Sequence, residues 1–409
     1  MRTLVWLNLR SGSMLLIWLN SLFLAAMALS GTFINIYIFR VDHSIAAIGQ
    51  FNFFEYLAYP IAFLFAGKLS KKWKEIWFLR VGVVLLAGFF IWIITQGNAP
   101  KVDLSMLGIL YGFGQGIYWF GFNILSFDWT TWETRPSFQG TLGFAGAIAT
   151  TAFPFLAGIL ISKAKNYSGY YMVFLLSLAL FALLLLISAK ATNSPKEKQF
   201  NLQEGFRFRE DPDWFRLWLG TIAFGLREGV YAFFISILAY SLTKSEEFFG
   251  LYSLVIGTLS FSAFYLAGKL QKWKISGKIV LAIAAFVLGV LSLLWLVIVN
   301  IKMLWIFGIF TALFFPFFMV PYQTILFNEI EETRRSTQHR TAYFISREMA
   351  LALGRLAGVG LIWWVAKNFA GQQVISLYSL IGLSFIITAY VIRKVEFKSK
   401  KEPSISGAD

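Results

Sequence analysis

Six ionisable residues lie deep inside long apolar stretches of the chain, namely Glu55, Arg227, Glu228, Arg347, Glu348 and Arg355. A charged side chain at the centre of a bilayer costs about 2.5–3.5 kcal/mol even on the scale that penalises it least, so each one needs a reason. A buried carboxylate can carry a proton. A guanidinium can grip a carboxylate, phosphate or sulfate through charge-assisted hydrogen bonds. Proton transfer and anion binding are therefore the chemistries that these residues could perform.

The three arginines have two interpretations. In the first, Arg227, Arg347 and Arg355 form a positively biased site for an anionic group. In the second, they form interhelical ion pairs with Glu228 and Glu348 that hold two helices together, and a ligand could still compete for those pairs. Residues seven positions apart lie almost on one helical face, so Glu348 and Arg355 should point the same way.

Glu55 has no obvious partner in its own half of the chain. A lone buried carboxylate can take up a proton, which makes Glu55 the first candidate for proton coupling, with Glu228 and Glu348 as the second candidates. The alternative is that Glu55 is hydrogen-bonded to Tyr56, to an asparagine or to the backbone. Near Arg355, the residues Gly354, Gly358 and Gly360 predict a small-residue surface suited to close helix contact or to movement between packed helices.

The composition excludes an ordinary water-soluble enzyme. Hydrophobic residues make up 58% of the 409 residues and charged residues only 14%, against about 25% in a typical soluble domain. Cysteine is absent and His43 and His339 are the only histidines, which leaves no basis for a disulfide framework or a thiolate metal site. We expect no catalytic residue, metal or cofactor. The net charge is +15, and the basic residues lie beside apolar segments. This placement indicates membrane orientation and not nucleic-acid binding.

A helix that crosses a bilayer needs about 20 predominantly apolar residues. Twelve such segments can be marked between charged or Gly, Pro and Asn breaks. They are 14–39, 46–66, 76–95, 104–127, 141–162 and 168–188 in the first half, and 217–243, 248–268, 279–299, 303–327, 341–366 and 374–392 in the second. The fold class that they predict is an all-α integral membrane protein with twelve transmembrane helices.

The distribution of Lys and Arg predicts the orientation of these segments. With both termini in the cytoplasm, the inner segments hold 24 of the 36 basic residues and the outer loops hold seven. Basic residues concentrate in short cytoplasmic loops, so this topology is strongly favoured. We expect a multi-pass protein of the cell membrane with both termini cytoplasmic.

The longest polar stretch divides the chain into two halves. Residues 1–188 form the first six-helix half, 189–214 a cytoplasmic linker and 215–394 the second half, while 395–409 are expected to be a disordered basic tail. The halves repeat each other at an offset of 201 residues. The tetrapeptide Ala-Gly-Lys-Leu occurs at 66–69 and again at 267–270, and Gly49 and Gly250 precede the two copies by the same distance.

Two parallel six-helix repeats joined by a cytoplasmic linker resemble the major facilitator superfamily, and the resemblance covers nearly the whole chain. The family's loop between spans two and three has the pattern Gly-x-Leu-Ala-Asp-Arg-x-Gly-Arg-Lys. Here Gly67, Leu69 and Lys72 fit that pattern, whereas Ser70 and Lys71 stand where Ala and Asp are usual. In the family, that aspartate accepts hydrogen bonds that stabilise the outward-open state, and a lysine cannot accept them. Either this contact is rebuilt from other residues here, or the control of the two states lies elsewhere.

The two repeated basic loops could gate the cytoplasmic side through contacts with acidic residues, or could merely follow the inside-positive bias. The gating candidates are Gly67, Lys68, Lys72, Asp128, Arg135, Gly268, Lys269 and Arg334. The resemblance also implies a central cavity formed by spans one, four, seven and ten. Asn35, Gln115, Asn123 and Gln323 could line that cavity, or could form hydrogen bonds between packed helices.

The resemblance implies a secondary transporter in which two halves rock about a site in the middle of the membrane. The arginines favour a small solute that is anionic or amphipathic, with the proton as a candidate coupling ion. A multidrug or lipid-head-group exporter of the same fold and a membrane-embedded lipid-modifying enzyme are the alternatives. The expected partners are the solute and the lipid bilayer, with no nucleic acid, and the protein is expected to be a monomer.

Overall fold

The computed structural model describes residues 11–96, 103–130, 135–164, 167–191, 201–267, 276–332, 336–369 and 371–395. Within these ranges the chain is almost entirely helical and contains no strand. The first half forms α1 (Ser11–Asp42), α2 (Ile45–Leu69), α3 (Glu75–Gln96), α4 (Leu104–Asp128), α5 (Arg135–Lys163) and α6 (Ser168–Ser188). The second forms η2 (Leu202–Phe206), α7 (Pro212–Thr243), α8 (Glu246–Ala267), α9 (Gly277–Leu293), η4 (Leu294–Leu296), α10 (Ile301–Glu332), α11 (Ser336–Asn368), α12 (Gly371–Ile381) and α13 (Ser384–Ile392).

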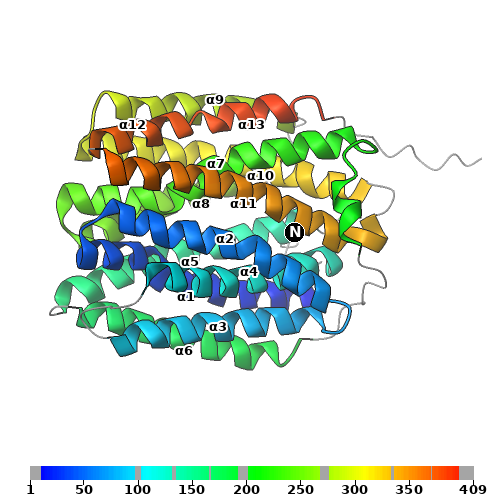
Figure 1. Cartoon of the computed structure of the whole chain (residues 1–409), viewed down its shortest axis with the longest axis horizontal. Helices are drawn as coiled ribbons and strands as arrows, with labels where there is room; N and C mark the ends of the chain where they lie inside the picture. Colours follow the sequence, from blue (N-terminus) through cyan, green and yellow to red (C-terminus); the bar gives the residue numbers. More distant parts are fainter. Residues whose placement is uncertain are drawn as a thin grey trace, which may run out of the picture.

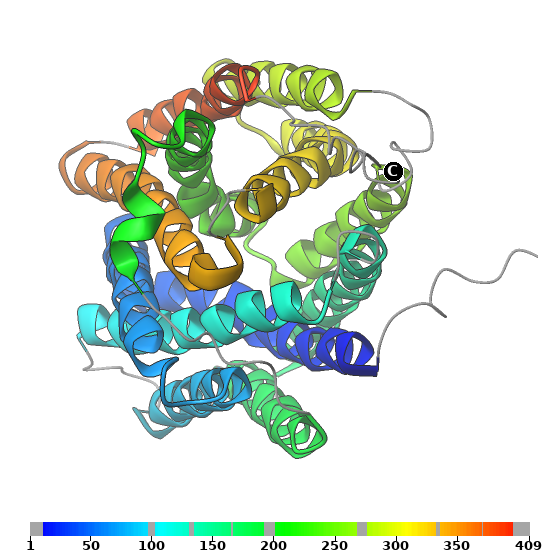
Figure 2. The ribbon, with the colours of Figure 1, turned by 90° about the vertical axis from the view of Figure 1, so that its right-hand side faces the viewer.

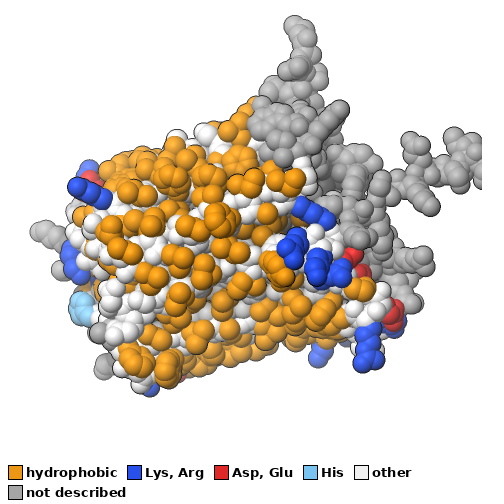
Figure 3. Space-filling view, turned by 90° about the horizontal axis from the view of Figure 1, so that it is seen from above, with side chains coloured by type: hydrophobic (Ala, Val, Ile, Leu, Met, Phe, Trp, Pro, Cys, Tyr) orange, Lys and Arg blue, Asp and Glu red, His pale blue; other side chains and the backbone are white. Residues whose placement is uncertain are grey.

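The helices match the predicted membrane spans. Among the described residues, ten helices are long and apolar enough to cross a bilayer, with η4 continuing α9 and α13 continuing α12. The other two predicted spans correspond to α2 and α4, which have 25 residues each. Figure 3 shows a broad apolar belt along the side of the bundle, with Lys and Arg gathered toward its ends. The predicted all-α membrane fold is confirmed.

The helices form two groups that lie side by side. In Figure 1, α1 to α6 occupy the lower part of the bundle and α7 to α13 the upper part. The view along the bundle in Figure 2 shows the same division, with α3 and α6 at one outer edge and α9 and α13 at the other. The main contacts between the groups are α2 against α11 and α5 against α8.

Glycines fix how closely the helices that carry the buried charges approach. In α4, Gly108 and Gly112 lie so near α2 that an added Cβ atom would be 2.3 Å from the Phe51 carbonyl oxygen and 2.0 Å from the Glu55 carbonyl oxygen. In α11, Gly354 and Gly358 lie as close to α7. The close helix contact predicted for this part of α11 is therefore confirmed, while Gly360 faces the Phe53 ring of α2.

Several helices are longer than their predicted spans. The helices α1, α7 and α10 have 32 residues each and α11 has 33, so at about 1.5 Å per residue each exceeds the roughly 30 Å hydrocarbon layer. The helix α7 begins at Pro212, capped by the Asp211 side chain, so the last residues of the predicted linker already belong to a helix. The element η2 packs on α11, where Gly205 contacts Ala342.

Candidate functional site

Arg355 of α11 is the centre of a buried ion cluster. Its Nη1 donates to Glu348 Oε1 at 2.9 Å, and its Nη2 donates to Glu228 Oε1 of α7 at 3.1 Å. Its Nε also donates to the second carboxylate oxygen of Glu228. This is the interhelical pairing expected under the second interpretation, and it places Glu348 and Arg355 on one face of α11 as predicted. One guanidinium thus faces two carboxylates, and the three side chains together carry one negative charge when ionised.

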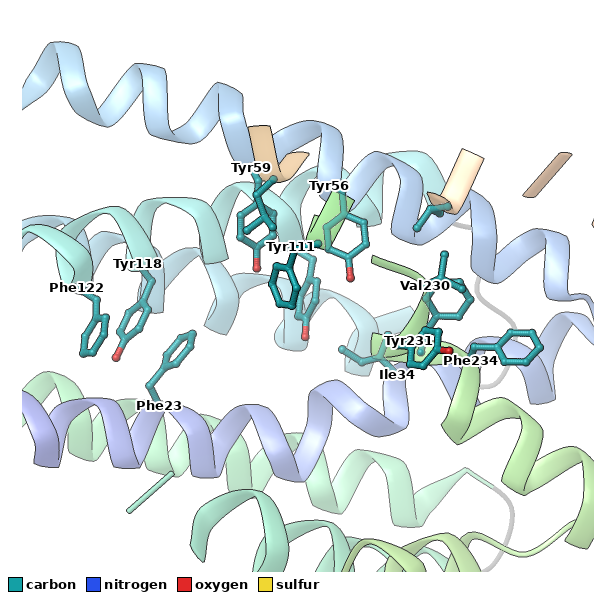
Figure 4. Close-up of a cluster of buried hydrophobic side chains, with 14 of the residues drawn as sticks. Phe23, Ile34, Tyr56, Tyr59, Tyr111, Tyr118, Phe122, Val230, Tyr231 and Phe234 are labelled. Atoms are coloured by element: carbon teal, nitrogen blue, oxygen red, sulfur yellow. The ribbon is translucent and has the colours of Figure 1, made fainter. Parts of the chain in front are cut away.

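The same guanidinium contacts the opposite half of the bundle. Its central carbon lies 5.2 Å from the Tyr56 ring centroid and 5.0 Å from the Tyr59 ring centroid, both on α2. Aromatic faces attract cations at such distances. Figure 4 shows both rings projecting from α2 into the bundle beside Tyr111 of α4. Arg355 therefore connects α7 and α11 of one half to α2 of the other.

Glu55 lies on α2 next to these tyrosines and is 6% exposed. The Gln115 side chain of α4 donates from Nε2 to Glu55 Oε1 at 2.9 Å. Glu55, for which the sequence showed no obvious partner in its own half, is thus hydrogen-bonded there, as in the alternative interpretation, but to Gln115 and not to Tyr56, an asparagine or the backbone. The close packing of α4 on α2 at Gly112 brings Gln115 within hydrogen-bonding distance. A neutral amide donor stabilises a carboxylate without cancelling its charge.

Arg227 and Arg347 differ from Arg355 in having no ion pair among the described residues. Both side chains are buried, and the Nε atom of each has no hydrogen-bond partner. The Arg227 guanidinium packs against aromatic rings, while its neighbour in sequence, Glu228, turns to Arg355. The first interpretation, an anion-binding role, therefore stays open for these two arginines.

The other polar candidates are divided between the halves. Asn35 of α1 accepts a hydrogen bond from Asn52 of α2 at 2.8 Å, so it contributes to helix packing in this structure. Asn123 of α4 is half-buried. Gln323 of α10 is also half-buried, and its Oε1 atom is buried without a hydrogen-bond partner.

The gating candidates have separate positions. Gly67 is buried near the end of α2, while Lys68 and Lys72 are exposed. Asp128 forms an ion pair with Arg340 of α11, at 2.7 Å from Arg340 Nε to Asp128 Oδ1. Arg135 begins α5, and its side chain lies outside the described part of the structure. Gly268, Lys269 and Arg334 also lie outside the described residues.

A second link between the halves, which was not predicted from the sequence, lies at the opposite end of the bundle from Asp128. Arg40 of α1 approaches Glu246 of α8, with 2.9 Å between Nη1 and Oε1. The Tyr170 hydroxyl of α6 donates to the same Oε1 atom at 3.0 Å. The sequence did contain a signal for this pair. Arg40 and Glu246 have opposite charges and stand at the ends of two predicted spans on the same side of the membrane. Arg340 was missed as well, although its basic character and its place at the start of a span were visible.

Among the described residues no group of three or more His, Cys, Asp or Glu side chains could hold a metal ion. The carboxylates of the Arg355 cluster are instead used on a guanidinium.

Comparisons with known proteins agree with this architecture. The family model described as Major Facilitator Superfamily matches residues 16–359. The chain is 31% identical over 396 residues to the uncharacterized protein YqgE of Bacillus subtilis, covering 96% of this chain and 92% of that protein.

The structure of this chain resembles the nucleoside transporter NupG, with a TM-score of 0.69 and 14% identity over 93% of this chain and 98% of that one. The human organic anion transporter MFSD10 gives a TM-score of 0.66 and 14% identity with the same coverage. With a matching family model over most of its length and a relative that it covers almost completely, this chain is a multi-span membrane protein that belongs to the major facilitator superfamily.

Proposed function

We propose that this protein is a secondary transporter that moves a small anionic or amphipathic solute across the cell membrane by alternating access. Both termini would face the cytoplasm, and a monomer would be the transporting unit. Family membership supports the transporter class. The observation that carries the rest of the proposal is the position of Arg355, which pairs with Glu228 and Glu348 in one half and stacks on Tyr56 and Tyr59 of the other.

The solute would bind where α2, α4, α7 and α11 meet. Glu228 is the more accessible partner of Arg355, because its side chain is 32% exposed whereas that of Glu348 is 5% exposed. An anionic group of the solute can therefore replace Glu228 on the planar guanidinium, which suits carboxylate and phosphate geometry. The tyrosines beside it offer apolar area for the rest of an amphipathic solute. Arg347, Arg227, Asn35, Asn123 and Gln323 are further candidates for solute contacts.

Displacement of Glu228 provides a reason for proton coupling. A carboxylate that loses its positive partner to another anion is stabilised in the protonated form. Solute binding and proton uptake would then favour each other, which is the requirement for symport. Glu55, held by the neutral Gln115, is a second group that can take up a proton at the same depth. Glu348 remains paired with Arg355.

The experiment begins with a search for a ligand. Thermal unfolding of the purified protein is measured against panels of metabolites, lipid head groups and drugs at pH 5.5 and 8, because a ligand of the folded state raises its apparent stability. Each ligand found is then tested for uptake into proteoliposomes with and without a proton gradient. Ligands that bind but never cross the membrane would argue against a carrier.

The proton step has its own test. Glu55→Gln, Glu228→Gln and Glu348→Gln are compared singly and together, with Glu247→Gln as the control because Glu247 is exposed at the start of α8. We expect the triple variant to retain downhill exchange but to lose gradient-driven accumulation. Accumulation that is unchanged at every pH in the triple variant would show that these carboxylates do not carry the proton.

A further inference from the structure

Arg227 is enclosed within the second half of the bundle by an aromatic cage formed by Tyr231, Phe315 and Phe385. The guanidinium carbon lies 4.3 Å from the Tyr231 ring centroid, 4.9 Å from that of Phe315 and 4.6 Å from that of Phe385. These rings come from α7, α10 and α13, so the cage is built by one half alone. The Arg355 cluster, in contrast, joins the two halves.

The cage attracts the cation but does not satisfy its donors. A guanidinium has five N–H donors and no acceptor. Aromatic faces stabilise positive charge, yet a buried charge with unfilled hydrogen bonds remains costly. Arg227 is 8% exposed, its Nε has no hydrogen-bond partner, and no carboxylate among the described residues pairs with it. The charge and geometry of this place therefore suit a negatively charged acceptor.

Two further donors lie beside the cage. The hydroxyl groups of Tyr231 and Tyr378 are both buried and make no hydrogen bond of normal geometry, although the Tyr231 hydroxyl lies near those of Tyr378 and Ser292, and the two tyrosine rings stack with centroids 4.3 Å apart. Gly382 packs directly against these groups, because a Cβ atom there would be 2.6 Å from the Tyr231 hydroxyl oxygen and 2.1 Å from Ser292 Oγ. Three groups able to donate to one anion thus gather in an apolar surrounding.

We propose that Arg227, with the hydroxyl groups of Tyr231 and Tyr378, binds a small anion inside the second half, at a site separate from the Arg355 cluster. Because Arg227 is only 8% exposed and three rings surround its guanidinium, the anion that reaches it must be small, such as chloride or a single carboxylate. Such a group comes either from a free inorganic anion or from the anionic end of a transported solute. In both cases it neutralises the one caged cation and stabilises the packing of α7, α10 and α13.

The first test measures thermal unfolding of the purified protein in sodium chloride and, at equal ionic strength, in the sodium salt of 2-(N-morpholino)ethanesulfonate, a bulky sulfonate that offers neither a small inorganic ion nor a carboxylate. We expect chloride to raise the Tm of the wild type in a saturable way, by about 2 °C or more. Arg227→Gln should abolish this rise. Arg347→Gln is the matched control, because Arg347 is also buried without an ion pair, and it should keep the rise. Equal Tm values for the wild type in the two salts, or a chloride effect that survives in Arg227→Gln, would overturn the proposal.

A second variant keeps the test decisive if Arg227→Gln does not fold. Tyr231→Phe combined with Tyr378→Phe retains both rings and removes only the hydroxyl groups. The chloride concentration for half-maximal stabilisation should rise about 100-fold, the size expected for the loss of two hydrogen bonds to a charged group. An unchanged concentration would contradict the proposal that the Tyr231 and Tyr378 hydroxyl groups donate to the anion.

Sodium acetate separates the two sources of the anion. A site for an inorganic ion should be stabilised more by chloride than by acetate, whereas a site for the carboxylate end of a solute should be stabilised more by acetate. Either order supports anion binding at Arg227, and an absence of both effects refutes it. These measurements need no transport, so the anion site and the transporter proposal can fail independently.

Discussion

Arg340 of α11 and Asp128 of α4 form a two-point ion pair across the halves at one end of the bundle, here called the inner end. The distances are 2.7 Å from Nε to Oδ1 and 2.9 Å from Nη2 to Oδ2. Their side chains are only 8% and 7% exposed, and the Phe127 and Phe344 rings meet beside them at 5.9 Å. The halves cannot separate at the inner end without breaking this pair.

Asp128→Asn should open the inner end. Removing one partner of a buried pair leaves an uncompensated charge at a cost of about 3–5 kcal/mol, and separation of the halves relieves that cost by hydrating Arg340. The chain has no cysteine, so spin labels can be placed at Lys72→Cys and Gln203→Cys, two exposed positions on opposite halves. We expect the distance distribution between these labels to shift to longer values.

The control for this variant is Asp213→Asn, because Asp213 pairs with Arg216 within one half. It should leave the distribution unchanged. Exchange of the charges, Asp128→Arg with Arg340→Asp, should restore the short distances. If Asp128→Asn and Asp213→Asn give the same distribution, the inner pair does not hold the halves together.

The pair at the opposite end, here called the outer end, should be a weaker lock. Arg40 has a side chain that is 32% exposed, so its pair with Glu246 resembles surface pairs worth about 0.2–1 kcal/mol. Glu246→Gln should therefore give a smaller shift than Asp128→Asn, seen between labels at Asp42→Cys and Lys302→Cys. Glu247→Gln, one residue away and exposed, is the control. A larger opening from Glu246→Gln than from Asp128→Asn would reverse this order.

Local helix geometry explains which part of the site was predictable. Glu348 and Arg355 are seven residues apart on one helix, so their shared face followed from the helical repeat alone. The pairing of Glu228 with Arg355 was one of two interpretations, because charge type shows which residues can pair but not which helices meet. The membrane spans were predictable for the same local reason, since each is a run of apolar residues.

Contacts set by helix register were not predictable. Glu55 and Gln115 were both candidates, yet their hydrogen bond depends on α4 packing at Gly112 against the Glu55 backbone. The stacking of Arg355 on Tyr56 depends on α2 meeting α11 across the halves, between residues about 300 positions apart in the chain. No short-range pattern in the sequence records such a meeting.

Arg355→Lys should abolish transport although the charge is retained. Lysine has a compact ammonium that cannot make the parallel bonds to both Glu228 oxygens while also reaching Glu348 and covering the tyrosine faces. Solute flux should fall at least 100-fold, with a lower Tm as Glu348 loses its partner. Arg216→Lys serves as the control, because Arg216 is a partly exposed residue at the start of α7 with one local ion pair. Flux near the wild-type level in Arg355→Lys would show that charge alone is sufficient at this position.

Gly112→Ala should separate the two helices that place Glu55. The added methyl group would meet the Glu55 carbonyl oxygen at 2.0 Å, and both partners are helix backbone that cannot rotate away. We expect a loss of stability of about 1–3 kcal/mol or more, as for overpacked interiors.

Gly88→Ala in α3 is the matched control, because no atom lies within 4 Å of its added Cβ. Alanine has a better helix propensity than glycine, so the Tm of this variant should be equal to that of the wild type or slightly higher. Since the clash pushes α2 from α4, the hydrogen bond from Gln115 to Glu55 should lengthen, and gradient-driven uptake should fall further in Gly112→Ala than the stability loss alone explains. Identical Tm and uptake in the two alanine variants would mean that α2 and α4 are not packed as closely as described.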